Sequence, residues 1–399
     1  MPHLRSRYLD ISIREDMKWS PIVSVLGMRQ VGKSTLLRQI SSSYLTLDHD
    51  ELLNQFSTGN WSQIEKAIRP LVIDEAQKCP GLFDRLKLLV DEKGRPGQFL
   101  LTGSVRFLSK KQIRESLTGR TSLLELLPLT LSESHSKPLF DFPKFIVNSH
   151  QDFKNKKNVI EALATRRHLK VSEVEHYLRV GGLPGICFKR NLEIQSRMRD
   201  AHLETLLFRE LQMILETKVP FIKLKSILQV LAQSSIQTPS ASHIARSVQL
   251  STPTVLNLLS AFEALFLIRS RGQSWAFTDL GLSSHLGAAR VENDLFHMER
   301  FVYQELYAQL TYCHRSRFQM ECYSTRGGIR IPFILKVEGA PTIAISVDPT
   351  LGATEKSLKG LTYFQKRSPG PIISVVLHRG TTGYVSSLGT YCIPYHWIS

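Results

Sequence analysis

The eight residues at positions 27–34 read GMRQVGKS, and this stretch constrains the fold more strongly than any other in the chain. It fits the pattern G-x-x-x-x-G-K-[ST], in which two glycines allow a tight loop whose backbone N–H groups point inward. Such a loop cradles phosphate groups, above all where a helix begins directly after it. The apolar residues 21–26 predict a buried strand before the loop, and residues 34–40 have helical spacing after it.

The loop residues have expected tasks in binding ATP and Mg²⁺. Lys33 should reach the terminal phosphates, and the hydroxyl of Ser34 should ligate the metal ion. The predicted nucleotide-binding set is Gly27, Met28, Arg29, Gln30, Val31, Gly32, Lys33, Ser34 and Thr35. The strand before the loop and the helix after it make a chance match improbable.

A second apolar run ends in two carboxylates. Residues 71–75 read LVIDE, which predicts a strand that ends at Asp74 and Glu75. Asp74 would hold Mg²⁺, directly or through water, and Glu75 would be the general base that activates the attacking water. The alternative is a strand capped by two solvated acids. The phosphate loop about 40 residues upstream favours the catalytic interpretation.

A further predicted strand, residues 98–104 (QFLLTGS), ends in small polar residues. The carboxyl ends of parallel strands form the ligand-binding edge of such a sheet. Thr102 or Ser104 is therefore a candidate to contact the terminal phosphate or to position the water. A simple β-turn is the alternative.

Arg120, which ends the run ESLTGR at 115–120, is the candidate arginine finger because a guanidinium is rigid and always charged. It would act on the transferred phosphate in its own chain or from a neighbouring subunit. A surface arginine without a catalytic role is the alternative. Arg29 and Arg106 are weaker candidates for the same task.

Strand and helix patterns alternate across residues 20–134, with short apolar runs at 44–47, 71–73 and 98–101. Strands that alternate with helices predict a parallel, doubly wound sheet. The predicted fold class is therefore α/β, with a P-loop NTPase core.

Several longer stretches carry a family resemblance: GMRQVGKSTLL (27–37), LVIDEAQKCP (71–80), FLLTGS (99–104), ESLTGR (115–120) and LLPLTLSE (126–133). Weaker matches are YLRVGGLPG (177–185), LLFREL (206–211), residues 244–268 and FTDLGL (277–282). With these stretches the chain resembles prokaryotic AAA-type (AAA+) ATPases whose C-terminal half is a domain of unknown function with a nuclease-like fold. The resemblance implies an ATPase core of the strand-inserted class and assembly into a ring or filament.

Four consecutive domains are predicted. They are an AAA+-like ATPase domain at 1–134, a basic linker and helical region at 135–235, a winged-helix-like module at 236–284 and a small nuclease-like α/β domain at 285–399. The linker prediction depends on charge, because residues 135–170 hold eight Lys and Arg against three Asp and Glu. A solvated surface loop is the alternative for that segment.

The winged-helix prediction depends on residues 242–265, which have the pattern of a helix-turn-helix. Residues 267–277 predict a basic wing that carries Arg269 and Arg271. DNA binding and packing or self-association are both open for this module, because its second helix is poor in Arg and Lys.

The resemblance suggests a restriction-type nuclease fold for the last domain, and that chemistry needs two or three acids and a lysine around a divalent metal. Glu299 fits the first acidic position that the resemblance implies. Pro332 stands where an Asp is expected, and Ser346 and Asp348 stand in place of a Glu and a Lys. No nuclease activity is therefore expected, and Glu299 is expected to be a structural remnant.

The chain has 51 Lys and Arg against 35 Asp and Glu, which gives a net charge of +16. Such an excess favours polyanions, so DNA of low sequence specificity is the expected partner, and a merely basic surface is the alternative. No apolar run approaches the roughly 18 residues that span a bilayer, and the N-terminus lacks a secretory apolar region. A cytoplasmic protein without a membrane partner is expected.

These patterns together predict a Mg²⁺-dependent ATPase that works as a nucleotide-driven switch or motor on DNA, in a homo-oligomer. The alternative is a nucleotide-gated scaffold in signalling or defence, which binds a protein partner and no nucleic acid. A small-molecule kinase is disfavoured, because Glu75 suits water activation and the sheet carries an extra strand between the two phosphate-site motifs.

Overall fold

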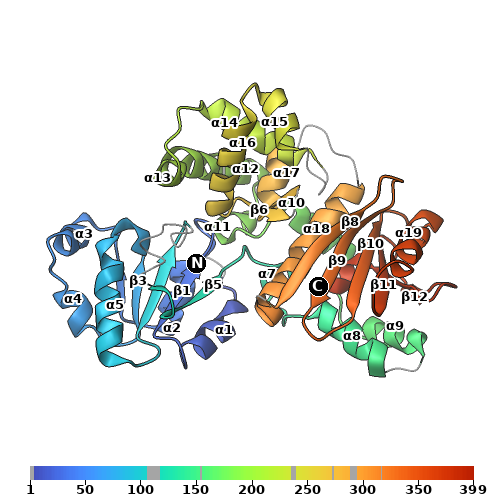
Figure 1. The fold of residues 1–399 in the computed structure, drawn as a ribbon, viewed down its shortest axis with the longest axis horizontal. Coiled ribbons are helices and arrows are strands. Elements are labelled where there is room, and N and C mark those ends of the chain that lie inside the picture. The colour runs from blue at the N-terminus through green and yellow to red at the C-terminus, as the bar shows by residue number, and fades with distance from the viewer. Residues whose placement is uncertain are drawn as a thin grey trace. The chain divides into compact units, whose positions relative to one another are not determined.

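Figure 1 shows the fold in the computed structural model, which describes all residues except 1–3, 106–116, 153–154, 235–239, 272–273, 288–293 and 316. The chain forms two compact units, and each is assembled from separate stretches. Unit 1 consists of Met1–Leu129, Leu183–Phe221 and Leu256–Ile268, and unit 2 of Thr130–Gly182, Ile222–Val255 and Arg269–Ser399. The structure thus groups the chain differently from the four consecutive domains, because stretches distant in sequence pack together.

Unit 1 is built on a five-stranded sheet in the order β2-β3-β4-β1-β5, in which all neighbours are parallel. The strands are β1 (Ile22–Leu26), β2 (Tyr44–Thr46), β3 (Leu71–Asp74), β4 (Phe99–Gly103) and β5 (Thr121–Glu125). β1, β3 and β4 are buried along their whole length, as expected for the centre of a parallel sheet. The predicted α/β core is confirmed, and β4 is the inserted strand between β1 and β3.

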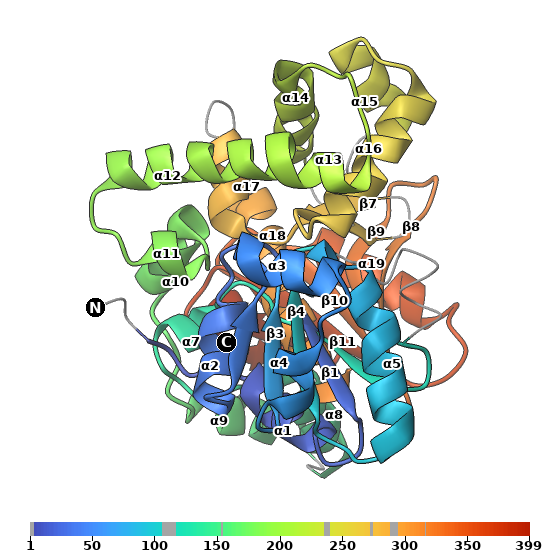
Figure 2. The same cartoon turned by 90° about the vertical axis from the view of Figure 1, so that its left-hand side faces the viewer.

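The helices of unit 1 come from different stretches of the chain. They are α1 (Leu9–Asp16), α2 (Lys33–Ile40), α3 (Asp50–Ser57), α4 (Ser62–Lys66), the 3-10 turn η1 (Ala76–Lys78), α5 (Gly81–Lys93), α11 (Pro184–Cys187), α12 (Leu192–Glu204), the π-helical turn η3 (Thr205–Glu210) and α13 (Leu211–Ile214). α12, η3 and α13 follow one another without a break and form one long helix in Figure 2.

Unit 2 contains a mixed six-stranded sheet in the order β12-β13-β11-β10-β9-β8. Its strands are β8 (Phe318–Ser324), β9 (Arg330–Val337), β10 (Thr342–Asp348), β11 (Ile372–His378), β12 (Tyr384–Val385) and β13 (Tyr391–Pro394). β10, β11 and β13 are parallel neighbours, whereas β8, β9 and β10 are antiparallel neighbours. β6 (Ile268–Arg271) and β7 (Ser274–Phe277) form a separate two-stranded sheet.

Other helices are α7 (Leu131–Ser134), α8 (Phe142–Asp152), α9 (Lys156–Ala164), α10 (Val171–Val180), α14 (Phe221–Ala232), α15 (Ala241–Val248), α16 (Thr252–Ala264), α17 (Leu280–Gly287), α18 (Asp294–Gln309), the π-helical turn η4 (Leu310–His314), α19 (Glu355–Gln365) and the 3-10 turn η5 (Tyr395–Ile398). Within the described ranges, no helix is long and apolar enough to cross a membrane.

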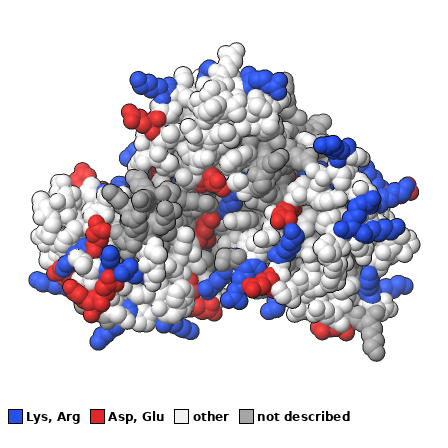
Figure 3. Space-filling view, viewed as in Figure 1, with Lys and Arg blue, Asp and Glu red and all other residues white. Residues whose placement is uncertain are grey.

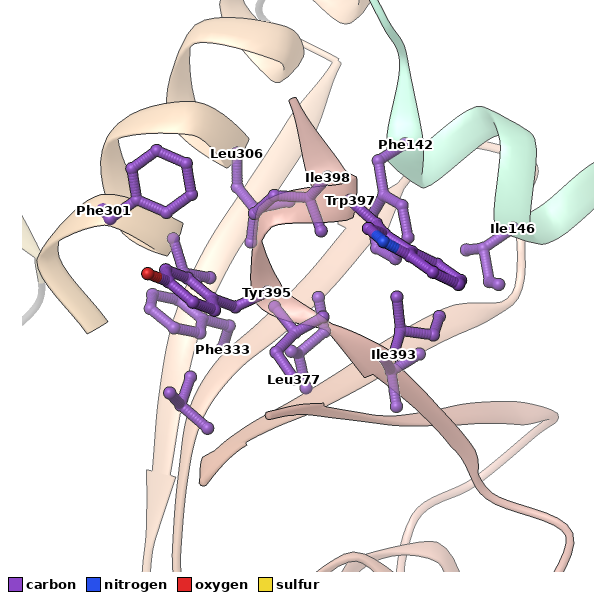
Figure 4. Packing of buried hydrophobic residues seen from close by; sticks show 14 of the residues in the cluster. Phe142, Ile146, Phe301, Leu306, Phe333, Leu377, Ile393, Tyr395, Trp397 and Ile398 are labelled. Atoms are coloured by element: carbon purple, nitrogen blue, oxygen red, sulfur yellow. The ribbon is translucent and has the colours of Figure 1, made fainter. Parts of the chain in front are cut away.

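Alternating side chains of the unit 2 sheet bury hydrophobic cores on its two faces. One face carries Phe333, Leu335, Ile343, Ile345, Val375 and Leu377, and the other carries Ile334, Ala344 and Val376. Figure 4 shows the larger core, in which the rings of Phe301 and Tyr395 meet edge-on with centroids 5.7 Å apart. Leu361 of α19 is buried in the smaller core.

The basic segment at residues 135–170 is not a linker, which corrects the prediction made from its charge. It forms α8 and α9, and Phe142, Ile146, Val159 and Leu163 of these helices are buried in the larger core of unit 2. Helical spacing gathers these apolar residues on one face of each helix. Only Lys144, Lys156 and Lys157 of the eight basic residues lie on these two helices, so the charge of the segment did not indicate its packed helical structure.

The predicted helix-turn-helix region contains α15, α16 and the β6–β7 hairpin, in that order. Its buried apolar positions include Ile244, Val248, Leu258 and Phe262. Arg269 is only 6% exposed, and its guanidinium lies 4.0 Å from the centroid of the Tyr307 ring. The hairpin therefore does not present Arg269 as a basic wing residue, because packing within unit 2 removes its side chain from the surface. The side chain of Arg271 lies outside the described part.

Two weakly matching motifs meet within unit 2. The N–H of Gly182 donates to Oδ2 of Asp279 at 2.7 Å. A Cβ on Gly181, whose φ is +73°, would lie 2.4 Å from the backbone nitrogen of Gly281. The two backbones lie too close together for a side chain at either position. This explains the glycines at 181 in YLRVGGLPG and at 281 in FTDLGL.

The predicted nuclease positions of unit 2 are occupied by protein contacts. Glu299 is buried on α18, and its two carboxylate oxygens accept hydrogen bonds from the guanidinium of Arg330 at the start of β9. Asp348 ends β10 and accepts hydrogen bonds from hydroxyl groups around the start of α19. Pro332 lies in β9 and Ser346 in β10. Both carboxylates thereby tie the sheet to its helices.

Candidate functional site

The loop at residues 27–34 joins the buried strand β1 to helix α2, as its sequence predicts. Gly27 follows the strand, and a Cβ at this position would lie 2.4 Å from the carbonyl oxygen of Leu126. Gly32 precedes α2 with a φ of +100°, a conformation that favours glycine. Backbone geometry therefore requires both glycines, and the loop ends at a helix start whose free N–H groups and dipole favour anions.

Lys33 begins α2, and its side chain is only 4% exposed. The ammonium group donates hydrogen bonds to the carbonyl oxygens of Gly27 at 2.9 Å and of Met28 at 3.0 Å. Burial lowers the pKa of Lys33, while nearby carboxylates, first of all Glu75, act in the opposite direction. A buried ammonium with three donors, held by the loop itself, is placed to transfer hydrogen bonds to phosphate oxygens.

Three hydroxyl groups converge on the carboxylate of Asp74, which ends β3 and is 5% exposed. Oδ2 accepts hydrogen bonds from Oγ of Ser34 at 2.8 Å and from the phenol of Tyr44 on β2. Oδ1 accepts a hydrogen bond from Oγ1 of Thr102 on β4. The structure thus brings Ser34 and Asp74 together, which are the two residues predicted to hold Mg²⁺.

Glu75 directly follows β3 in a left-handed conformation, with φ +55°. This region is uncommon for residues other than glycine and is found at functional sites. The Glu75 N–H donates to Oγ1 of Thr102 at 3.2 Å, and Nε2 of Gln77 donates to Oε2 of Glu75 at 2.5 Å. Burial raises the pKa of Glu75, and the charge of Lys33 opposes that shift. A raised pKa suits a carboxylate that takes a proton from water.

We expect Thr102→Val to slow nucleotide hydrolysis about tenfold, because the lost hydroxyl bonds the carboxylate of Asp74 and the backbone N–H of Glu75 and so positions both residues. Valine keeps the volume of this buried side chain, and loss of the hydrogen bonds should lower the free energy of unfolding by about 1–3 kcal/mol. Phosphate release and thermal unfolding measure the two effects. Thr121→Val is a matched control, since its hydroxyl bonds Oγ of Ser24 at 3.0 Å elsewhere in the sheet. Equal hydrolysis rates for the two variants would contradict the positioning role.

A cavity of about 330 Å³ opens beside these residues within unit 1. Its lining comprises Leu4, Arg5, Arg7, Gln30, Gly32, Lys33, Ser34, Thr35, Leu36, Gln39, Glu75, Leu129, Pro184 and Gly185. The volume falls in the usual range for small-molecule sites. Polar loop residues and apolar side chains share the lining, which is the combination that the phosphates and base of a nucleotide require.

Arg120 does not join this cluster. Its guanidinium donates two hydrogen bonds to the carboxylate of Asp91, at 2.7 and 2.8 Å, and its carbonyl oxygen accepts one from the N–H of Ile22. Arg120 thus lies at the start of β1, whereas the phosphate loop follows the end of this strand. The full length of β1, roughly 16 Å at 3.3 Å per residue, separates Arg120 from the loop. The prediction that Arg120 acts on the phosphate of its own chain is wrong, and an action on a neighbouring subunit stays a prediction. Arg106 lies outside the described residues.

Four further polar groups lie at the site and were not predicted from the sequence: Tyr44, Gln77, His202 and Glu210. Nη1 of Arg29 lies 2.6 Å from Oε1 of Glu210, and Nδ1 of His202 lies 3.2 Å from Oε1 of Gln30. Gln77 stands in the DEAQK run and Glu210 in LLFREL, so the family resemblance was the available signal for both. No local pattern pointed to Tyr44 or His202.

Residues 20–135, which contain the loop, β3 and β4, match the family described as AAA domain. These residues therefore form a P-loop domain of the AAA type. Beyond this AAA domain, residues 171–285 match a domain of unknown function (DUF8612).

The chain is similar to an uncharacterized protein of Mycobacterium tuberculosis, with 27% identity over 260 residues, 64% of this chain and 51% of the relative. An uncharacterized protein of Methanocaldococcus jannaschii is 23% identical over 264 residues, 61% of this chain and 55% of the relative. The chain therefore spans about half the length of these relatives.

Two solved structures resemble parts of the chain. A Walker-type ATPase of Pyrococcus abyssi has a TM-score of 0.39 and 16% identity, over 69% of this chain and 94% of that one. A signal transduction ATPase with numerous domains and a tetratricopeptide repeat sensor, from Pyrococcus horikoshii, has a TM-score of 0.26 and 12% identity, over 78% of this chain and 48% of that one.

Proposed function

We propose that the AAA domain hydrolyses ATP with Mg²⁺, and that this reaction drives a switch or motor that acts on DNA. The observation that supports hydrolysis most directly is the hydrogen bond of 2.8 Å between Ser34 and Asp74. Glu75 and Lys33 line the same cavity as Ser34. The residues to which we assign metal binding, phosphate binding and general-base catalysis thus lie around one loop, which supports the proposal.

Ser34 and Asp74 fit Mg²⁺ by the chemistry of their oxygens. This ion is usually held by one or two protein oxygens, by waters and by the phosphates of the substrate, so a larger cluster of protein ligands is not needed. When bound, the metal would neutralise charge on the phosphates. Tyr44 and Thr102 would keep the carboxylate of Asp74 oriented through the hydrogen bonds that they donate.

In the proposed reaction, the oxygen of a water molecule attacks the γ-phosphorus of ATP. Glu75 accepts a proton from that water, the bond between the γ-phosphorus and the bridging oxygen breaks, and its electron pair leaves with ADP. Lys33 stabilises the charge on the phosphate oxygens. The products are ADP and phosphate.

Phosphate release from ATP, measured with Mg²⁺ and again with excess chelator, tests this proposal. We expect turnover that depends on the metal and that saturates with ATP. ATP binding without turnover, in the presence of Mg²⁺ and of DNA, would show that the site binds nucleotide without hydrolysing it. Light scattering in the same solutions tests the predicted homo-oligomer.

The proposed action on DNA is supported by the charge of the chain. Residues 315–399 carry ten Lys and Arg against four Asp and Glu, a net charge of +6. Figure 3 shows Lys and Arg side chains gathered on the face where Figure 1 draws α19. Lys356, Lys359 and Lys366, on and just after that helix, are exposed. Lysines on an open surface are suited to phosphate contacts, which position DNA without reading its sequence.

We expect Lys356→Gln, Lys359→Gln and Lys366→Gln together to weaken binding to duplex DNA about tenfold at low salt. Each lysine that contacts a phosphate releases counterions from the DNA, and each lost contact removes that favourable contribution to binding. The dependence of affinity on salt should also become shallower, by about one unit of slope per lost contact. Fluorescence anisotropy between about 50 and 200 mM salt measures both. The matched control is Lys18→Gln, Lys66→Gln and Arg95→Gln, three exposed residues of unit 1. Equal losses in both triple variants would contradict a DNA surface at α19.

The second candidate function is a nucleotide-gated scaffold that binds protein rather than nucleic acid. It draws support from the helix-turn-helix region, where Arg269 is buried rather than presented to a ligand. DNA-stimulated ATP hydrolysis separates the two candidates. A rise in turnover on adding DNA supports the switch or motor, whereas no DNA binding at low salt, with or without ATP, favours the scaffold.

A further inference from the structure

An ion pair joins the phosphate loop to the long helix of unit 1. Nη1 of Arg29 donates to Oε1 of Glu210, the last residue of η3, at 2.6 Å. The side chain of Arg29 is 34% exposed, whereas that of Glu210 is 1% exposed. The second oxygen of Glu210, Oε2, is buried without a hydrogen-bond partner among the described residues. Glu210 is therefore a buried carboxylate held mainly by one cation of the loop.

A second contact between the same two elements lies beside this ion pair. Nδ1 of His202 on α12 lies 3.2 Å from Oε1 of Gln30, and because an amide oxygen only accepts, this contact is a hydrogen bond in the tautomer with the proton on Nδ1. Burial lowers the pKa of His202 to about 4, with smaller effects from Arg29 and Lys33, so its ring is neutral near pH 7. Gln30 has a left-handed φ of +62°. Two neighbouring loop residues are thus bonded to one helix.

The guanidinium of Arg29 lies in the electrostatic neighbourhood of the catalytic carboxylate. Burial lowers the pKa of Arg29, but the hydrogen bond and charge of Glu210 outweigh burial, and Glu75 and Asp48 raise the pKa further. Gln30 and Lys33, close to Arg29 in the loop, line the nucleotide cavity together with Glu75. Arg29 does not itself line the cavity in this arrangement, so it would reach the terminal phosphate by turning from Glu210 toward Glu75.

We propose that Arg29 is the own-chain cation that contacts the terminal phosphate of ATP, and that Glu210 holds Arg29 until that phosphate binds. This assignment deepens the proposed ATP hydrolysis and depends on it. It gives Arg29 the task that the sequence suggested for Arg120. Arg29 would be a catalytic residue, and Glu210 a positioning residue that acts through it.

The exchange has a mechanical consequence, because a carboxylate cannot remain buried and charged without a partner at low cost. When Arg29 turns from Glu210 to phosphate, Glu210 must reach water, and η3 must move to expose it. A π-helical turn contains an extra residue per turn and commonly marks a functional position in a helix. The α12–η3 helix would therefore respond to a nucleoside triphosphate and not to a diphosphate, which lacks the terminal phosphate.

Arg29→Ala, Glu210→Gln and the parent protein should be compared for affinity toward Mg·ADP and toward a slowly hydrolysed Mg·ATP analogue. Arg29→Ala should lose about tenfold in triphosphate affinity, keep its diphosphate affinity and turn over about 100-fold more slowly. Glu210→Gln should bind the triphosphate about fivefold more tightly, because Arg29 no longer has to leave a charged partner. Arg197→Ala is the control, since it breaks an exposed ion pair of 2.6 Å with Glu193 on the same helix.

Hydrogen exchange of the unmodified protein gives a second readout that needs no variant to fold. Amides of residues 202–210 should exchange faster with the triphosphate analogue than with Mg·ADP. The assignment of Arg29 and Glu210 is overturned if Arg29→Ala keeps the triphosphate affinity and turnover of the parent protein. It is also overturned if the amides exchange equally fast with both nucleotides. Neither result would contradict ATP hydrolysis by the parent protein. A parent protein that binds neither nucleotide overturns this assignment and the proposed function together.

Discussion

Lys33→Ala is expected to abolish measurable binding of Mg·ATP, which corresponds to a loss of affinity of at least about 100-fold. The ammonium of Lys33 is buried and already hydrogen-bonded to the loop, so its position is fixed before the phosphates arrive. Alanine removes the only lysine of the loop and the charge-assisted hydrogen bonds that it would donate. Calorimetric titration with ATP and Mg²⁺ measures the loss.

The control for this variant must separate lost binding from lost folding. Lys33→Met retains the apolar stem in its buried site and should fail to bind in the same way. Lys66→Ala removes an exposed lysine of unit 1 and should bind as the parent does. A Lys33→Ala protein that melts cooperatively near the parent temperature and binds ATP with unchanged affinity would contradict the role of this loop.

Glu75→Gln is expected to retain ATP binding and to slow hydrolysis by about 100-fold or more, the scale of general-base loss. The amide has the size of the carboxylate but cannot accept a proton from water. Gln77 and Thr102 contact Glu75 through its side chain and its backbone, so the loop should keep its shape. Single-turnover phosphate release and nucleotide titration together measure chemistry and binding.

The pH dependence of hydrolysis gives Glu75 a further signature. Burial raises its pKa, and only its deprotonated form can accept a proton, so turnover should fall as pH decreases through that raised pKa. This acidic limb should lie above the usual range of a glutamate and should be absent in Glu75→Gln. Glu51→Gln, at an exposed position of α3, is the matched control and should behave as the parent does. Parent-like turnover in Glu75→Gln would assign the base to another group.

Much of the fold and part of the site could be predicted because their signals are local. The phosphate loop needs a strand before it, a helix after it and two glycines within it, and all of these lie within about 20 consecutive residues. Asp74 and Glu75 were predicted for the same reason, since a buried strand ends at them. The contact of Ser34 with Asp74 follows once the sheet order places β3 close to β1.

The rest depends on contacts between distant residues, which one sequence does not reveal. Glu210 lies about 180 residues from Arg29, and nothing near it in LLFREL indicates that its carboxylate is buried. Arg120 has a suitable neighbourhood in sequence, but the parallel register places it at the wrong end of β1. In residues 135–170, the apolar residues at helical spacing determine the structure, because they are buried in the core of unit 2. The high charge of the segment did not indicate this packing.

The assembly of unit 1 from three separate stretches has a consequence for how the protein is made. A ribosome that has completed the AAA domain at residue 135 has made the phosphate loop and its carboxylates, but not Pro184, Gly185 or Glu210. The last stretch of unit 1 ends at Ile268, 133 residues after the AAA domain ends at residue 135. A nascent chain therefore carries a recognisable phosphate loop long before it has a complete nucleotide site, and a fragment cut at the family boundary would remain at that stage.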